Sequence, residues 1–128
     1  MKNIAISILI ALVLIVVAFI IAKGRVSTTL SNVNNISVID GKQIIDLTAK
    51  GGYSPGKSIA KAGIPTILRF TTNGTFDCSS SIRIPSMNVS KNLALAGITD
   101  IDLGSPKVGI LRGSCGMGMY PFEIDFQN

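Results

Sequence analysis

An uninterrupted apolar segment near the N-terminus constrains this chain more than any other feature. Residues Ile4 to Ala22 read IAISILIALVLIVVAFIIA, nineteen residues without a charge and with Ser7 as the one polar interruption. As an α-helix the segment would rise about 28 Å, which is enough to cross the hydrocarbon core of a bilayer. The sequence therefore predicts one transmembrane anchor over residues 4–22, preceded by a short tip of residues 1–3.

A cleaved secretory signal is the alternative interpretation of this run. The apolar region of such a signal usually spans about 7 to 15 residues and ends in an A-x-A-like site. Here the run is longer and ends in AFIIA, so we favour a retained single-pass anchor in the cell membrane. Lys2 lies before the run and Lys23 and Arg25 follow it, which favours a cytoplasmic C-terminal domain by one charge. An extracytoplasmic domain is the other possibility.

Two segments of different composition follow the anchor. Residues 23–35, KGRVSTTLSNVNN, are rich in Ser, Thr and Asn and lack an apolar period, so we expect a flexible tether. Residues 36–128 show short apolar alternations separated by turn residues, as in Phe122-Glu123-Ile124-Asp125-Phe126. About seven such strands with inward aliphatic side chains predict one all-β domain, a β-sandwich or small barrel.

Several local predictions accompany this fold. Asp40-Gly41, between two apolar runs, predicts a hairpin turn. Leu68 and Phe70 should share the inner face of one strand. Val108 and Ile110 are expected in an alternating strand after a turn, with their side chains pointing inward. Residues 90–96 are expected to form a turn of helix at the edge of the domain.

Composition excludes several kinds of functional site. The chain has no histidine, which removes imidazole zinc sites, Ser-His-Asp hydrolysis and His₂Cys electron-transfer copper centres. Once the three cations beside the anchor are set aside, nine of the 12 basic residues remain against seven acidic ones. A nearly neutral domain without a basic cluster or an aromatic ladder predicts no nucleic-acid partner.

The informative chemistry is a sulfur-rich run, Cys115-Gly116-Met117-Gly118-Met119. In an extended loop, alternate spacing would send the sulfurs of Cys115, Met117 and Met119 the same way, and the glycines would leave them uncovered. Cys78 is the upstream cysteine that can join them. Thiolates and thioethers together select a soft monovalent ion, Cu(I) first and Ag(I) as its mimic.

The sequence allows two other interpretations of these sulfurs. Methionine is a common gap-filling core residue, and we expect that role for Met87, which lacks glycine neighbours. Cys78 and Cys115 would form a disulfide if the domain faces an oxidising compartment. A disulfide alone does not explain why Met117 and Met119 are separated by glycine.

The ordered motifs resemble the cupredoxin-like domain family of bacterial copper resistance, and within it the membrane-anchored Cu(I) chaperones. The resemblance covers roughly Gly51 to Phe126. Its specific part is Cys78 together with the Cys-Gly-Met-Gly-Met run, whereas its other matches are shared with cupredoxin-like domains of wider function. Those other matches are Gly51-Gly52-Tyr53-Ser54-Pro55, Ala62-Gly63-Ile64-Pro65, Leu68 and Phe70.

This resemblance implies a fold, a ligand set and a partner. It implies a Greek-key β-sandwich in which Cys78 and Cys115 bind one or two Cu(I) ions as thiolates, while Met117 and Met119 complete a weaker, more exposed part of the site. It also implies a monomeric, non-enzymatic copper chaperone or buffer that passes Cu(I) to the metal-binding domain of a copper-exporting P-type ATPase. The chain departs from the family pattern at Tyr120-Pro121-Phe122, beside the predicted site.

Overall fold

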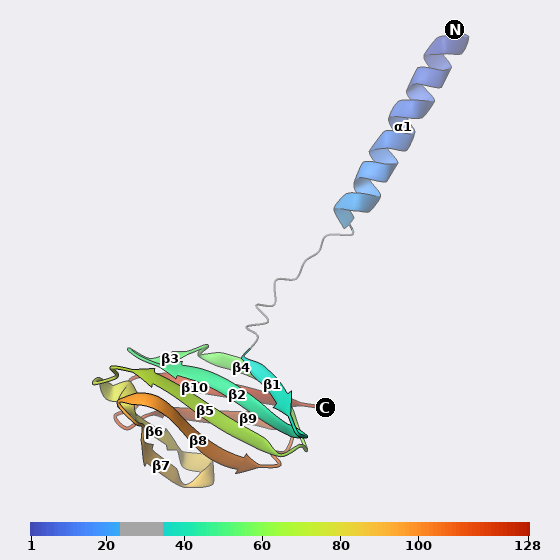
Figure 1. The fold of residues 1–128 in the computed structure, drawn as a ribbon. Coiled ribbons are helices and arrows are strands. Elements are labelled where there is room, and N and C mark those ends of the chain that lie inside the picture. The colour runs from blue at the N-terminus through green and yellow to red at the C-terminus, as the bar shows by residue number, and fades with distance from the viewer. Residues whose placement is uncertain (24–34) are drawn as a thin grey trace. The chain divides into compact units, whose positions relative to one another are not determined.

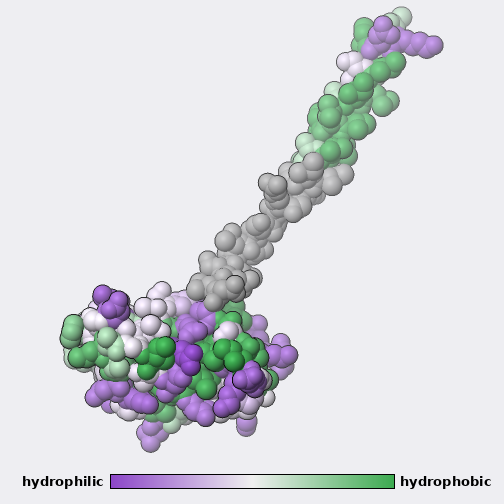
Figure 2. All heavy atoms as spheres, viewed as in Figure 1, coloured by the Kyte–Doolittle hydropathy of each residue, from purple (hydrophilic) through white to green (hydrophobic). Residues whose placement is uncertain are grey.

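The N-terminal unit is a single helix. The computed structural model of the protein describes residues 1–23 and 35–128, so most of the predicted tether lies outside the described residues. Helix α1 spans Lys2–Lys23, and hydrophobic side chains cover it along most of its length (Figure 2). Its Lys2–Phe19 stretch is long and apolar enough to cross a membrane, a property that a signal sequence near an N-terminus shares.

The second unit consists of two five-stranded sheets that pack as layers (Figure 1). The first sheet has the order β1-β2-β5-β8, with the short β3 beside β2, and the second has the order β4-β10-β9-β6-β7. The first sheet contains β1 (Ile36–Ile39), β2 (Lys42–Ala49), β3 (Tyr53–Ser54), β5 (Thr66–Asn73) and β8 (Ala96–Gly104). The second contains β4 (Lys57–Lys61), β6 (Ser81–Ile84), β7 (Val89–Asn92), β9 (Gly109–Cys115) and β10 (Pro121–Gln127). Two single-turn 3₁₀ helices, η1 (Cys78–Ser80) and η2 (Pro85–Met87), flank β6.

The sheets are mixed in direction. Strand β2 runs parallel to β5, and β4 runs parallel to β10, whereas the remaining pairs are antiparallel. The strands of each parallel pair are joined by a longer crossover connection, because two parallel neighbours cannot be joined by a hairpin. The expectation of a mostly β chain with one apolar N-terminal helix is confirmed.

The core lies between the two sheets and follows the alternation of the sequence. Leu68 and Phe70 are fully buried, as predicted, while Arg69 between them faces outward and forms a two-point ion pair with Asp100 of β8. The rings of Tyr53, Phe70 and Phe122 form an edge-to-face cluster with centroids 5.0 to 5.7 Å apart. Such aromatic contacts add to the free energy gained from area burial. Phe70 lies on β5, the strand before Cys78, and Phe122 lies on β10, which pairs with the strand that ends at Cys115.

The predicted Asp40-Gly41 hairpin is confirmed. Both residues have positive φ angles, 51° and 74°, and they connect β1 to β2, whose first residue Lys42 pairs with Ile39. Two successive left-handed residues match the right-handed twist of the flanking strands.

Three local predictions are wrong. Residues 90–96 form no helical turn, because β7 ends at Asn92 after pairing with β6, and Leu93 then enters the core. Val108 and Ile110 are 58% and 49% exposed because Leu111, one position on, takes the inner register of β9. Met87 is 37% exposed in η2 rather than buried in the core.

Candidate metal centre

Cys78 and Cys115 meet at one end of the β-sandwich. Cys78 opens η1, directly before β6, and Cys115 is the last residue of β9. Antiparallel pairing of β6 with β9 places Ile82 opposite Cys115, which returns η1 to the end of β9. The two cysteines are 37 residues apart in sequence, their Cα atoms are 5.7 Å apart, and they are joined as a disulfide. The fold therefore brings together the two predicted thiol ligands.

The two cysteines differ in their access to solvent. Cys115 points into the core and is fully buried, whereas Cys78 is half-buried at the edge of the same cluster. The inward direction of Cys115 follows from β9 itself, where Leu111, Gly113 and Cys115 occupy alternate positions on the inner face. A partner reaching the sulfur pair from solvent meets the Cys78 side first.

The loop after Cys115 is a tight turn, not the extended run predicted above. The amide of Gly118 donates to the carbonyl of Cys115 at 2.9 Å, and Gly118 has a φ of 77°, a conformation that favours glycine. The amide of Cys115 donates to the carbonyl of Tyr120 at 3.0 Å, which closes the loop at the start of β10. Alternation therefore does not govern where these side chains point.

Both methionines of this loop lie in solvent. Met117 is 77% exposed and Met119 is 59% exposed, beside the fully buried Cys115. The amide of Met119 donates to the Sγ of Cys115 at 3.2 Å, so the main chain of the loop touches the sulfur directly. The loop thus offers two accessible thioethers next to a sulfur held by a backbone donor.

Sequence reasoning missed Asp77, which directly precedes Cys78, and the hydrogen bond that Tyr53 makes beside the cysteines. The Tyr53 hydroxyl donates to the Ser81 carbonyl at 2.8 Å, and burial, with the negative charge of Asp77 as the smaller cause, raises the pKa of Tyr53. One oxygen of Asp77 accepts a bond from Ser79 at 2.7 Å, while the other is buried without a partner among the described residues. No local pattern signals the contact of Tyr53 with Ser81, because the two residues are 28 positions apart in sequence.

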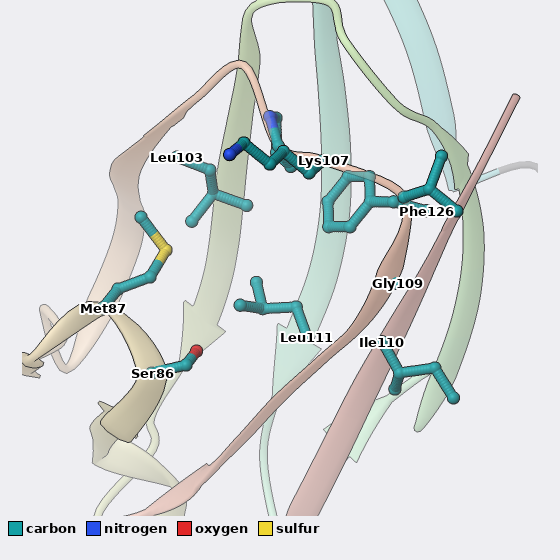
Figure 3. Close-up of a pocket in the computed structure, with 10 residues that line it drawn as sticks. Ser86, Met87, Leu103, Lys107, Gly109, Ile110, Leu111 and Phe126 are labelled. Atoms are coloured by element: carbon teal, nitrogen blue, oxygen red, sulfur yellow. The ribbon is translucent and has the colours of Figure 1, made fainter.

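A pocket at the opposite end of β9 does not belong to this centre. It has a volume of about 460 Å³, and Leu103, Leu111 and Phe126 line it (Figure 3). Met87 stands on one side, and Lys107 extends along its upper edge (Figure 3). Met87 therefore belongs to this pocket and not to the group formed by Cys78, Cys115 and their loop.

The chemistry of the donor set fits a soft ion. Within residues 1–23 and 35–128, no three His, Cys, Asp or Glu side chains gather into a potential metal site. Two cysteine sulfurs alone fall short of the four thiolate or imidazole ligands typical of structural zinc. A thiol pair with adjacent thioethers, by contrast, is the kind of donor set that Cu(I) prefers.

Known proteins resemble this chain in structure rather than in sequence. No family model and no curated protein matches the sequence. A solution structure of a copper-binding protein in its apo form matches with a TM-score of 0.66 and 23% identity, over 72% of this chain and 94% of that one. The Cu(I)-bound metal-binding domain of the Streptococcus pneumoniae D39 Cu(I)-exporting P-type ATPase CopA matches with a TM-score of 0.65 and 22% identity, over 73% of this chain and 93% of that one. The chain thus shares its fold with domains of copper-handling proteins.

Proposed function

We propose that this protein is a membrane-anchored Cu(I)-binding protein that acts as a copper chaperone or buffer. The observation that carries the proposal is the meeting of Cys78 and Cys115 at the base of the Cys-Gly-Met-Gly-Met loop, across 37 residues of sequence. The copper-related functions of the two structural neighbours support it. Within this proposal the β unit is a cupredoxin-like Greek-key domain, and its motifs resemble those of the membrane-anchored Cu(I) chaperone CupA.

Cu(I) binding requires the reduced form of the cysteine pair. Two thiols of a small-molecule reductant give two electrons and two protons to the protein disulfide and join as a disulfide. Cu(I) then replaces the thiol protons of Cys78 and Cys115, which pass to the solvent. Met117 and Met119, both exposed, supply weaker thioether ligands on the solvent side. The site holds one or two Cu(I) ions in this proposal, and Ag(I) serves as a mimic.

Transfer of the ion proceeds by ligand exchange. A thioether binds Cu(I) more weakly than a thiolate does, so thiolates of an acceptor displace Met117 and Met119 first and the buried Cys115 last. We propose the metal-binding domain of a copper-exporting P-type ATPase as the acceptor. The ion is never released into water, and no catalytic group is needed, so we propose that the protein is not an enzyme.

Helix α1 retains the protein in the membrane in this proposal, with the β unit on the cytoplasmic side. The cytoplasm keeps thiols reduced, which is the state in which the pair binds Cu(I). Labelling of intact cells with a membrane-impermeant maleimide after mild reduction tests this orientation. Protection of Cys78 until the cells are lysed is the expected result, whereas labelling in intact cells would place the domain outside.

An extracytoplasmic structural or interaction β-domain without metal is the competing function. The disulfide between Cys78 and Cys115 favours it, because an exported domain would hold that bond permanently. The two candidate functions differ in what the reduced protein does with copper.

An anaerobic Cu(I) titration separates them. The full-length, fully reduced protein in detergent micelles competes with a chromogenic Cu(I) chelator, next to the variants Cys78→Ser and Cys115→Ser and the control Met87→Leu. We expect strong competition by the parental chain and by the control, and its loss in either cysteine variant. If the reduced parental protein leaves the chelator fully loaded, the copper function is wrong and the structural one stands.

A further inference from the structure

We propose that Ser81 is the positioning residue of the sulfur pair, and that its hydroxyl sets how readily Cys78 and Cys115 act together. The inference rests on the proposed function for its copper aspect, but its redox aspect stands without it. Ser81 is the first residue of β6, directly after η1. Ser81 has no sulfur that could bind Cu(I), and it belongs to none of the sequence motifs described above.

The Ser81 side chain bridges the two segments that carry the cysteines. Its Oγ accepts a hydrogen bond from the amide of Gly116 at 3.2 Å and donates one to the carbonyl of Cys78 at 3.3 Å. Gly116 directly follows Cys115, so each bond ends on a cysteine or on its immediate neighbour. A hydroxyl can donate and accept at once, which a methyl group cannot do.

The main chain of Ser81 is itself held in place. Its amide donates to the carbonyl of Cys78, and its carbonyl accepts the hydrogen bond from the buried Tyr53 hydroxyl at 2.8 Å. Ser81 thus contacts η1, the loop after β9 and strand β3 at once. Because three elements hold Ser81 in place, its hydroxyl has a fixed position next to the two cysteines.

The contact with Gly116 leaves no spare room. A Cβ atom added at Gly116 would lie 2.7 Å from the Ser81 Oγ, closer than real Cβ atoms approach such a neighbour. Gly116 has a φ outside the left-handed region, so alanine is compatible with its backbone and only this contact opposes it. The main chain of the loop at Gly116 is therefore in direct contact with the Ser81 hydroxyl.

The consequence differs between the two states of the cysteine pair. In the disulfide, the S–S bond holds the segments together whether or not the bridge is present. In the dithiol, the β6–β9 pairing still aligns the two segments, and the Ser81 bridge is the side-chain contact that holds the Cys78 carbonyl next to the loop after β9. Loss of the hydroxyl therefore lets the two segments move apart in the reduced state alone. This movement lowers the effective concentration of one thiol toward the other, and it weakens both disulfide formation and Cu(I) chelation.

Redox equilibration without copper tests the inference. The full chain in detergent micelles is equilibrated with glutathione and glutathione disulfide, and two glutathione thiols give two electrons and two protons to the protein disulfide and join as glutathione disulfide. The dithiol fraction is read from the mass added by alkylation, which is unambiguous because the chain has two cysteines. Loss of a hydrogen bond predicts that Ser81→Ala shifts this equilibrium about tenfold toward the dithiol, which is about 30 mV for a two-electron couple.

Matched variants keep the test decisive. Ser80→Ala removes a hydroxyl one residue away that takes no part in the bridge, and it should leave the equilibrium unchanged. Gly116→Ala should shift it in the same direction as Ser81→Ala, and the double variant should show less than the sum, because the added Cβ no longer meets an oxygen. This cycle also covers the case in which Ser81→Ala alone folds poorly.

The outcomes distinguish the positioning role from the copper function. An equilibrium constant for Ser81→Ala within twofold of the parental value, or equal to that of Ser80→Ala, would overturn the role of Ser81. A redox shift together with a matching loss of Cu(I) affinity supports both proposals. A redox shift in a protein that never competes for Cu(I) keeps the positioning role and rejects the copper function.

Discussion

Gly113 lies directly beneath the ring of Phe122, its register partner across β9 and β10. A Cβ atom at Gly113 would fall inside the van der Waals envelope of that ring, which is itself buried and held edge-to-face against Tyr53 and Phe70. The contact lies two residues before Cys115, on the same inner face of β9. Because Gly113 has no side chain, the Phe122 ring can pack directly on β9, the strand that ends at the buried Cys115.

Gly113→Ala should therefore destabilise the β unit. An extra methyl group in a well-packed core typically lowers the free energy of unfolding by about 1–3 kcal/mol. Denaturant unfolding of the oxidised protein measures it, with Gly56→Ala as the control, because a Cβ at Gly56 meets its nearest atom at an ordinary 3.8 Å. Equal stability of the two variants would mean that the ring of Phe122 moves aside freely.

Replacement of the loop methionines should weaken copper binding without harming the fold. Leucine keeps the volume of Met117 or Met119 and removes the thioether, and both positions are exposed. We expect each single variant to lose affinity for Cu(I), and a tenfold loss corresponds to about 1.4 kcal/mol. Chelator competition measures the affinity, and Met87→Leu serves as the control at the far end of β9. Unchanged affinity in the double variant Met117→Leu, Met119→Leu would leave the cysteines as the whole site.

Reduction and copper should act in opposite directions on stability. The disulfide closes a loop of 37 residues, and loss of such a cross-link typically costs about 2–4 kcal/mol. Reduced protein should melt at a lower temperature than oxidised protein, and Cu(I) should restore part of the difference because it binds the folded state. Anaerobic thermal unfolding with and without Cu(I) measures both effects. Cu(I) that leaves the melting temperature of the reduced chain unmoved would contradict the proposed site.

Tyr53 should make the fold sensitive to alkaline pH. Burial raises the pKa of Tyr53 above its ordinary value of 10.0, so the folded state holds the phenol proton more tightly than the unfolded state does. The resulting stabilisation is fully present below pH 10.0 and is lost as the pH rises through the higher pKa of the folded state.

Tyr53→Phe separates this effect from other alkaline titrations. The variant loses the hydrogen bond to Ser81, worth about 1 kcal/mol at neutral pH, but its stability should fall less steeply than that of the parental protein above pH 10.0. Denaturant unfolding of both proteins at neutral and alkaline pH gives the two slopes. Parallel slopes would show that Tyr53 ionises in its ordinary range.

Local patterns in the sequence predicted several elements correctly. The apolar run predicted α1, the Asp40-Gly41 pair predicted the first hairpin, and alternation placed Leu68 and Phe70 in the core. Each of these follows from residues that are neighbours along the chain. The same reasoning erred at Val108 and Ile110, because alternation marks two faces but does not say which one a partner sheet will cover.

The sequence by itself determined which donor atoms are available, namely two thiols, two thioethers beside glycines and no imidazole. Only the tertiary structure decided that Cys78 meets Cys115, that the loop after Cys115 turns rather than extends, and that Ser81 stands between the two segments. These relationships depend on the register of β6 against β9, which joins residues more than thirty positions apart. Register is a property of packed sheets, so no local pattern could have specified it.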